Sequence, residues 1–99
     1  MQTESLISIN DFCASHKIEI SFISSLQRTG LIEIIRIEET WFIDRDQLQL
    51  LEKYIRLYYE LNINIEGIES INHLLNKIIA MNDEIISLRN SLRLYEENR

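Results

Sequence analysis

The chain has 99 residues, of which 45% are hydrophobic, and a formal net charge of −6; this composition is typical of one small folded domain and excludes intrinsic disorder as its main state. It contains no proline, two glycines and one cysteine, so an intrachain disulfide and a multi-cysteine zinc site are both excluded. The excess of acidic residues disfavours binding to nucleic acid, because phosphates are bound by clustered Lys and Arg.

The N-terminal third predicts two short helices. The first is expected to begin at Ser8, because Ser8 and Asp11 have the spacing at which a hydroxyl caps the helix and a carboxylate lies near its positive end. The second is expected over residues 20–29, where apolar side chains three residues apart share one face. Gly30 follows directly and predicts that this helix stops in a left-handed turn.

The middle of the chain predicts a small β-hairpin and then a third helix. Residues 32–43 are rich in isoleucine and aromatic side chains, which favour strands, and the polar residues 38–40 separate two apolar runs. Asp44 and Gln47 have the spacing of a capping box, which predicts a helix from there to about Leu61.

A long last helix is predicted over about residues 66–95. Its apolar positions recur in steps of three and four residues without a break, which is the a/d pattern of a coiled coil. Such a helix is about 45 Å long and exceeds what the preceding residues can cover, so we expect these positions to form a dimerisation seam with a second copy. A helix that folds back on its own domain is the alternative. The seam consists of Ile71, Leu74, Ile78, Met81, Ile85, Leu88, Leu92 and Tyr95.

The order of these elements resembles the MerR-type winged helix-turn-helix. Residues 17–32 read KIEISFISSLQRTGLI, similar to the second-helix segment of MerR proteins that ends in E-R-x-G-L-L. The resemblance implies a mainly α fold: a winged helix-turn-helix domain with a small β-hairpin wing over residues 1–64, and a long C-terminal coiled-coil dimerisation helix over residues 65–99. It also implies antiparallel pairing of the two long helices, which we adopt, although Ile at a with Leu at d favours parallel pairing.

Several positions depart from the MerR pattern. MerR regulators carry Arg, Arg and Tyr on the exposed face of the second helix, where this chain has Ser21, Ser24 and Ser25. Their wing usually carries Arg or Tyr where residues 41–43 here read Trp, Phe and Ile. Arg28 is the only positive residue in the second helix, so the sequence predicts a partner other than DNA.

The whole chain also resembles the chaperone-modulator proteins of the CbpM type. The resemblance is carried by LISINDF at 6–12, GLIE at 30–33, IRLYYEL at 55–61, NIEGI at 64–68 and HLL at 73–75. It implies a chaperone modulator that binds and inhibits the J-domain of a DnaJ/CbpA-type co-chaperone. The alternative function is that of a MerR-family DNA-binding transcriptional regulator.

This resemblance also indicates where a partner would bind. J-domains carry a basic helix, so an inhibitor needs a complementary acidic face, and residues 1–44 hold seven acidic and three basic side chains. Trp41 and Phe42 are neighbours in a predicted strand, so one of them is expected to face out as an aromatic anchor, unless both pack inside. The candidate partner-binding residues are Asp11, Glu19, Glu33, Glu38, Glu39, Trp41 and Phe42.

No pattern in the sequence indicates catalysis. A Gly-rich phosphate loop, H-E-x-x-H and G-x-S-x-G are all missing, so we expect neither enzymatic activity nor a cofactor or metal. Cys13, His16 and His73 are expected to be packing or surface residues, because no base or metal-type neighbours accompany them. The sequence does not open with a basic segment followed by an apolar run, and no apolar run approaches 18 residues, so we expect a cytoplasmic protein.

Overall fold

The computed structural model of the chain describes residues 5–98. The chain divides into two compact units, Met1–Glu69 and Ser70–Arg99. Over its described residues, 5–69, the first unit holds three short α-helices and a small antiparallel sheet, and it ends with the first turn of the long helix α4 (Ile65–Glu97). The second unit is the remainder of α4. The chain is therefore mainly helical, with a small sheet and a long C-terminal helix, as the sequence predicts.

Helices α1 (Ile9–His16) and α2 (Ile20–Arg28) form where the sequence predicts them, α1 behind its Ser8 cap and α2 without a side-chain cap at its start. The Ser8 hydroxyl accepts a hydrogen bond from the Asp11 backbone N–H, which satisfies one free donor of the first turn of α1. Helix α2 stops before Gly30, whose φ of 80° is a conformation that glycine adopts without strain.

The sheet has three antiparallel strands in the order β1-β3-β2. The predicted hairpin is confirmed: β2 (Ile35–Ile37) and β3 (Thr40–Asp44) flank a tight turn at Glu38 and Glu39. The third strand, β1 (Leu6–Ser8), was not predicted; it pairs with the other edge of β3 through the register Ile7 to Ile43. Three residues are too few to show an alternating pattern of their own, so this strand depends on its long-range pairing.

The third helical segment is less regular than the sequence predicts. It consists of a 3-10 turn, η2 (Arg45–Gln47), the helix α3 (Leu48–Ile55) and a π-helical turn, η3 (Arg56–Glu60). The Asp44 carboxylate caps the start by accepting from the Asp46 N–H at 2.9 Å. The prediction that Gln47 completes a capping box with Asp44 is wrong, because the Gln47 side chain hydrogen-bonds to the backbone of Glu33 instead.

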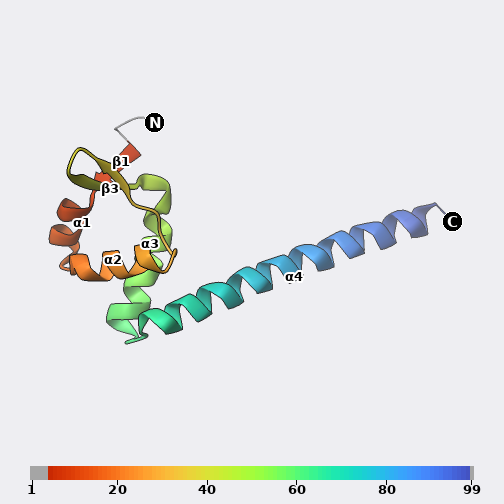
Figure 1. The fold of residues 1–99 in the computed structure, drawn as a ribbon. Helices are drawn as coiled ribbons and strands as arrows, with labels where there is room; N and C mark the ends of the chain where they lie inside the picture. Colours follow the sequence, from red (N-terminus) through yellow and green to blue (C-terminus); the bar gives the residue numbers. More distant parts are fainter. Residues whose placement is uncertain (1–4, 99) are drawn as a thin grey trace. The chain divides into compact units, whose positions relative to one another are not determined.

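The core of the first unit lies where α1, α2, α3 and the sheet meet. Figure 1 shows α2 crossing α3 rather than running alongside it, with the sheet covering the other ends of α1 and α3. The most deeply buried side chains come from α2, β3, α3 and the first turn of α4, so each of these elements contributes to one continuous core. The buried residues are Ile9, Phe12, Cys13, Ile18, Phe22, Ile23, Leu26, Leu31, Ile32, Ile43, Leu51, Tyr54 and Ile68.

An aromatic cluster ties α2 to the π turn. Phe22 lies 4.6 Å from Tyr58 and 5.4 Å from Tyr59, measured between ring centroids. The Tyr59 hydroxyl accepts a hydrogen bond from the backbone N–H of Glu19, just before α2. These contacts attach the end of the third helical segment to the start of the second helix.

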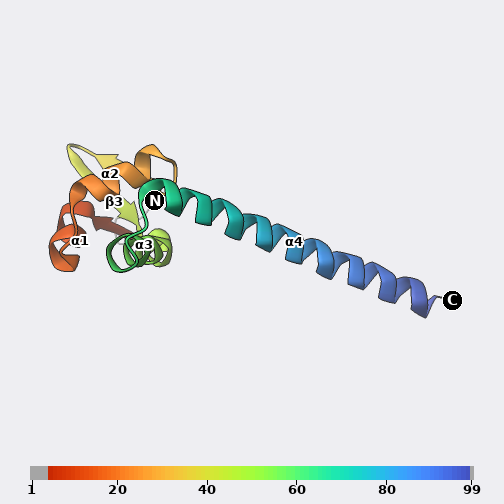
Figure 2. The same cartoon turned by 90° about the horizontal axis from the view of Figure 1, so that it is seen from below.

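Helix α4 (Ile65–Glu97) is one uninterrupted helix, visible from a second direction in Figure 2. Asn64 caps it, because its side-chain oxygen accepts from the Gly67 N–H at 2.8 Å. Within residues 5–98, no helix is both long enough and apolar enough to cross a membrane.

Candidate functional site

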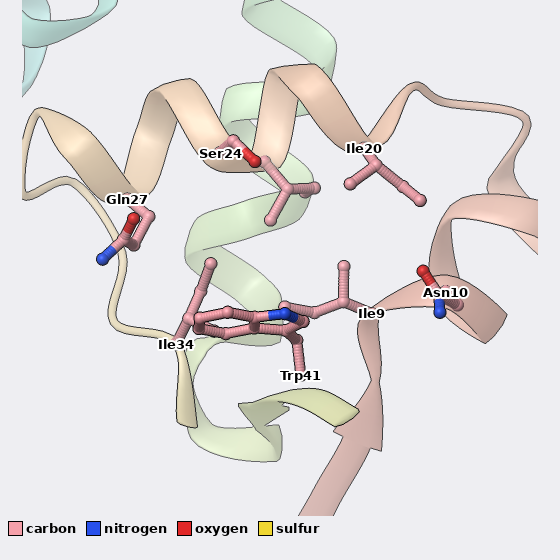
Figure 3. Close-up of a pocket in the computed structure, with 8 residues that line it drawn as sticks. Ile9, Asn10, Ile20, Ser24, Gln27, Ile34 and Trp41 are labelled. Atoms are coloured by element: carbon pink, nitrogen blue, oxygen red, sulfur yellow. The ribbon is translucent and has the colours of Figure 1, made fainter. Parts of the chain in front are cut away.

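An apolar groove lies between α2 and the hairpin in the first unit, Met1–Glu69, which we call the winged-helix unit. Its volume is about 250 Å³. Figure 3 shows the indole of Trp41 and the side chain of Ile34 facing α2 across the groove, with Ile9 beside the indole. The lining residues are Ile9, Asn10, Ile20, Ile23, Ser24, Gln27, Ile34 and Trp41, and none of them is charged.

Trp41 and Phe42 take different positions, as their neighbouring places in one strand require. Alternation along β3 puts Trp41 on the same face of the sheet as Ile43, which is fully buried, but Trp41 lies beyond the core and is 47% exposed. Phe42 lies on the opposite face and is half-buried. The expected exposed aromatic side chain is therefore Trp41. Its ring also stacks with the guanidinium of Arg36, whose Cζ lies 5.3 Å from the ring centroid.

The predicted acidic residues are all exposed and fall into two groups. Asp11, Glu19 and Glu33 are each the chain neighbour of a groove-lining residue, namely Asn10, Ile20 and Ile34. Glu38 and Glu39 form the turn of the hairpin, where Glu38 has a φ of 51°.

The exposed face of α2 carries hydroxyls rather than cations. Ser21 donates to the Glu19 carboxylate at 3.2 Å, and Ser25 donates to the Ser21 carbonyl at 3.0 Å. The guanidinium of Arg28, the single cation of α2, donates to the Ser25 hydroxyl at 3.2 Å. Ser24 lines the groove. This face therefore offers hydrogen-bonding groups without a concentration of positive charge.

All of the net charge belongs to the first unit. Residues 1–69 hold twelve acidic and six basic side chains, whereas residues 70–99 hold four of each. The winged-helix unit thus carries the full charge of −6, and its potential attracts basic partners and repels phosphate.

Burial shifts the pKa of two titratable side chains of this unit. Burial raises the pKa of the Cys13 thiol and of the Tyr54 phenol, so both stay protonated near neutral pH. Among residues 5–98, no group of three or more His, Cys, Asp and Glu side chains is placed to hold a metal ion.

The predicted seam residues of α4 lie within the second unit. From Leu74 to Tyr95 their side chains are 46–66% exposed in the single chain, and Ile71 is half-buried. Leu75, Ile79 and Ile86 add further exposed apolar surface between seam positions. The apolar side of this helix is therefore available to a second helix.

Sequence reasoning missed the groove itself, although it singled out Trp41 and Ser24. Four segments far apart in the chain contribute to it: the start of α1, the exposed side of α2, residue 34 and β3. The one local signal was Ile20, which shares a helical face with Ser24 and Gln27 at a spacing of four and three residues but is 51% exposed.

Comparison with known proteins assigns the chain to a family through a match over most of its length. A family model described as MerR HTH family regulatory protein matches residues 7–90, which covers most of the chain. No curated protein and no solved structure gives a significant match. The match includes α1, α2, the hairpin, α3 and most of α4. The chain therefore belongs to the MerR HTH regulatory protein family.

Proposed function

We propose that this chain is a chaperone modulator that binds and inhibits the J-domain of a DnaJ/CbpA-type co-chaperone. The observation that carries the proposal is the exposed face of α2, the helix that reads DNA in a helix-turn-helix. In this chain the face presents Ser21 and Ser24, and its one cation, Arg28, is hydrogen-bonded to Ser25. A face of this kind lacks the cations that phosphate binding requires.

The charge and the exposed apolar surface support a protein partner. The winged-helix unit holds twice as many acidic as basic side chains, which favours association with a basic surface such as the basic helix of a J-domain. Trp41 offers a large exposed ring beside an apolar groove, and tryptophan is a frequent anchor in protein interfaces. As a homodimer through α4, the protein would present two such surfaces.

The second candidate is a DNA-binding regulator, and the family match favours it. Helix-turn-helix proteins obtain affinity from phosphate contacts by Lys and Arg and specificity from base contacts. The single cation of α2, Arg28, contacts Ser25, and Arg36 of the hairpin stacks on Trp41. Binding to DNA through α2 would therefore depend on very few charges.

A direct comparison of the two partners tests the proposal. Calorimetry with a purified J-domain is expected to show saturable binding, and an excess of the chain should suppress J-domain stimulation of Hsp70 ATPase activity. Gel shifts with random duplex DNA should show weak binding with a small salt slope, because each phosphate contact contributes about −0.9 to that slope. Tight duplex binding with a steep salt dependence and no J-domain binding would favour the regulator.

A further inference from the structure

We propose that the groove between α2 and the hairpin receives one large apolar side chain projecting from a basic partner surface. The proposal rests on the proposed function, because it places the J-domain contact at a defined point of the winged-helix unit. The partner-binding site predicted from the sequence consisted of acidic residues and an aromatic anchor, and the groove adds an apolar pocket to it.

The lining of the groove determines the chemistry of its occupant. Ile9, Ile20, Ile23, Ile34 and Trp41 supply apolar walls, and no charged side chain lines the groove. Its volume of about 250 Å³ exceeds the ~150 Å³ of an apolar cavity that holds a benzene ring. One Leu, Met or Phe side chain would therefore fit. Asn10, Ser24 and Gln27 add polar groups that can hydrogen-bond to the backbone around the inserted residue.

The surroundings of the groove identify the charge of that partner surface. Exposed carboxylates at Asp11, Glu19 and Glu33 stand next in the chain to groove-lining residues, and Glu39 lies two residues before Trp41. The two cations that are closest in the chain to groove-lining residues are Arg28, which is bonded to Ser25, and Arg36, which is stacked on the indole. An apolar groove with acidic neighbours complements an apolar side chain that has basic neighbours.

Trp41 makes this proposal directly testable, because it is the only tryptophan of the chain and it lines the groove. Tryptophan emission can be followed during titration with a J-domain in which any tryptophan is replaced by phenylalanine. We expect the Trp41 emission to move to shorter wavelength and to become less sensitive to acrylamide as the groove fills. Binding detected by calorimetry with an unchanged emission and unchanged quenching would overturn the groove proposal while the proposed function stands.

A matched pair of variants gives the second test. Ser24→Phe places a ring inside the groove, whereas Gln49→Phe places the same ring on an exposed position of α3 outside it. We expect Ser24→Phe to weaken J-domain binding about tenfold or more and Gln49→Phe to change it much less. Equal affinities for the two variants would refute the groove as the contact point.

The remaining outcomes identify other occupants. If the wild-type chain does not bind the J-domain at all, the proposed function fails, and the groove proposal fails with it. If Trp41 becomes protected as the free protein is concentrated, the occupant is a second copy of the chain. If duplex DNA protects Trp41 and the J-domain does not, the groove belongs to a DNA-binding surface. Each of these results contradicts the proposal.

Discussion

The side-chain amide of Gln47 makes both of its hydrogen bonds to the backbone of one residue, Glu33. Its oxygen accepts from the Glu33 N–H and its nitrogen donates to the Glu33 carbonyl, each at 2.8 Å. The amide therefore acts like a short piece of β-ladder between the segment that follows α2 and the turn that precedes α3. Glu33 is followed by Ile34, so the contact also fixes one wall of the groove.

Removing this amide should loosen the segment that leads into the wing. We expect Gln47→Ala to lower the free energy of unfolding by about 1–2 kcal/mol, because two hydrogen bonds of ordinary net strength are lost. Gln49→Ala is the matched control, since Gln49 is exposed on the following helix. Urea unfolding followed by circular dichroism measures both variants. Equal stabilities would show that the Gln47 contact contributes nothing.

The predicted dimerisation seam can be tested with charged substitutions. Ile78→Asp or Ile85→Asp would place an unpaired carboxylate in the apolar interface, at a cost of several kcal/mol. We expect sedimentation velocity to show monomer or unfolded chain for the double variant and dimer for the wild type. Asn76→Asp, at an exposed position outside the a/d pattern, should remain dimeric. A folded, dimeric double variant would place the interface elsewhere.

The two turn carboxylates should affect the rate of association more than the lifetime of the complex. Reversing Glu38 and Glu39 to Lys removes part of the attraction that guides a basic partner. We expect the association rate constant for a J-domain to fall and its salt dependence to flatten, as measured by stopped flow. A faster dissociation with an unchanged association rate would contradict this role.

Replacing Trp41 should change the dissociation rate more than the association rate. Truncating the exposed indole with Trp41→Ala removes a contact area next to the groove, and interface tryptophans commonly contribute about 2 kcal/mol or more. We expect mainly faster dissociation of the J-domain complex. Phe42→Ala, on the other face of β3, is the comparison variant. If Phe42→Ala weakens binding and Trp41→Ala does not, the contact lies on the opposite side of the wing.

The cap of α4 offers a prediction that is independent of any partner. Asn64→Ala removes the acceptor for the Gly67 N–H and should cost about 1 kcal/mol of stability, whereas Asn64→Asp keeps an acceptor and should cost little. Thermal unfolding compares the two variants. An equal loss for both would mean that another property of Asn64 matters.

The features that the sequence predicted correctly are those with local signals. Ser8 caps α1 and Gly30 ends α2 through contacts within a few residues, and the polar residues 38–40 mark the hairpin turn. The fold family follows from the order of such elements. Features that depend on partners far away in the chain were not predictable in this way, because local patterns do not show which remote segments pair or in which register.

Three features illustrate this limit. Strand β1 exists because its short run pairs with β3, more than thirty residues later in the chain. The Gln47 amide hydrogen-bonds to the backbone of Glu33, 14 residues away, although its spacing from Asp44 predicted a partner within the same helix start. The groove combines four segments. The exposed Ile20 can therefore be recognised as a groove residue only once the fold places Ile34 and Trp41 opposite α2.

The π turn at Arg56–Glu60 makes this part of the chain sensitive to its length. A π turn holds more residues than the α-helical turn that it replaces, and the Leu61 N–H here donates to the Arg56 carbonyl, five residues earlier. Deleting one residue would return the segment to an α-helix, in which successive residues are about 100° apart around the axis, and would change the angular positions of Tyr58 and Tyr59. Tyr59 would then lose the Glu19 N–H, and the two tyrosines could no longer both contact Phe22. Single substitutions within residues 56–60 should be tolerated far better than a one-residue deletion.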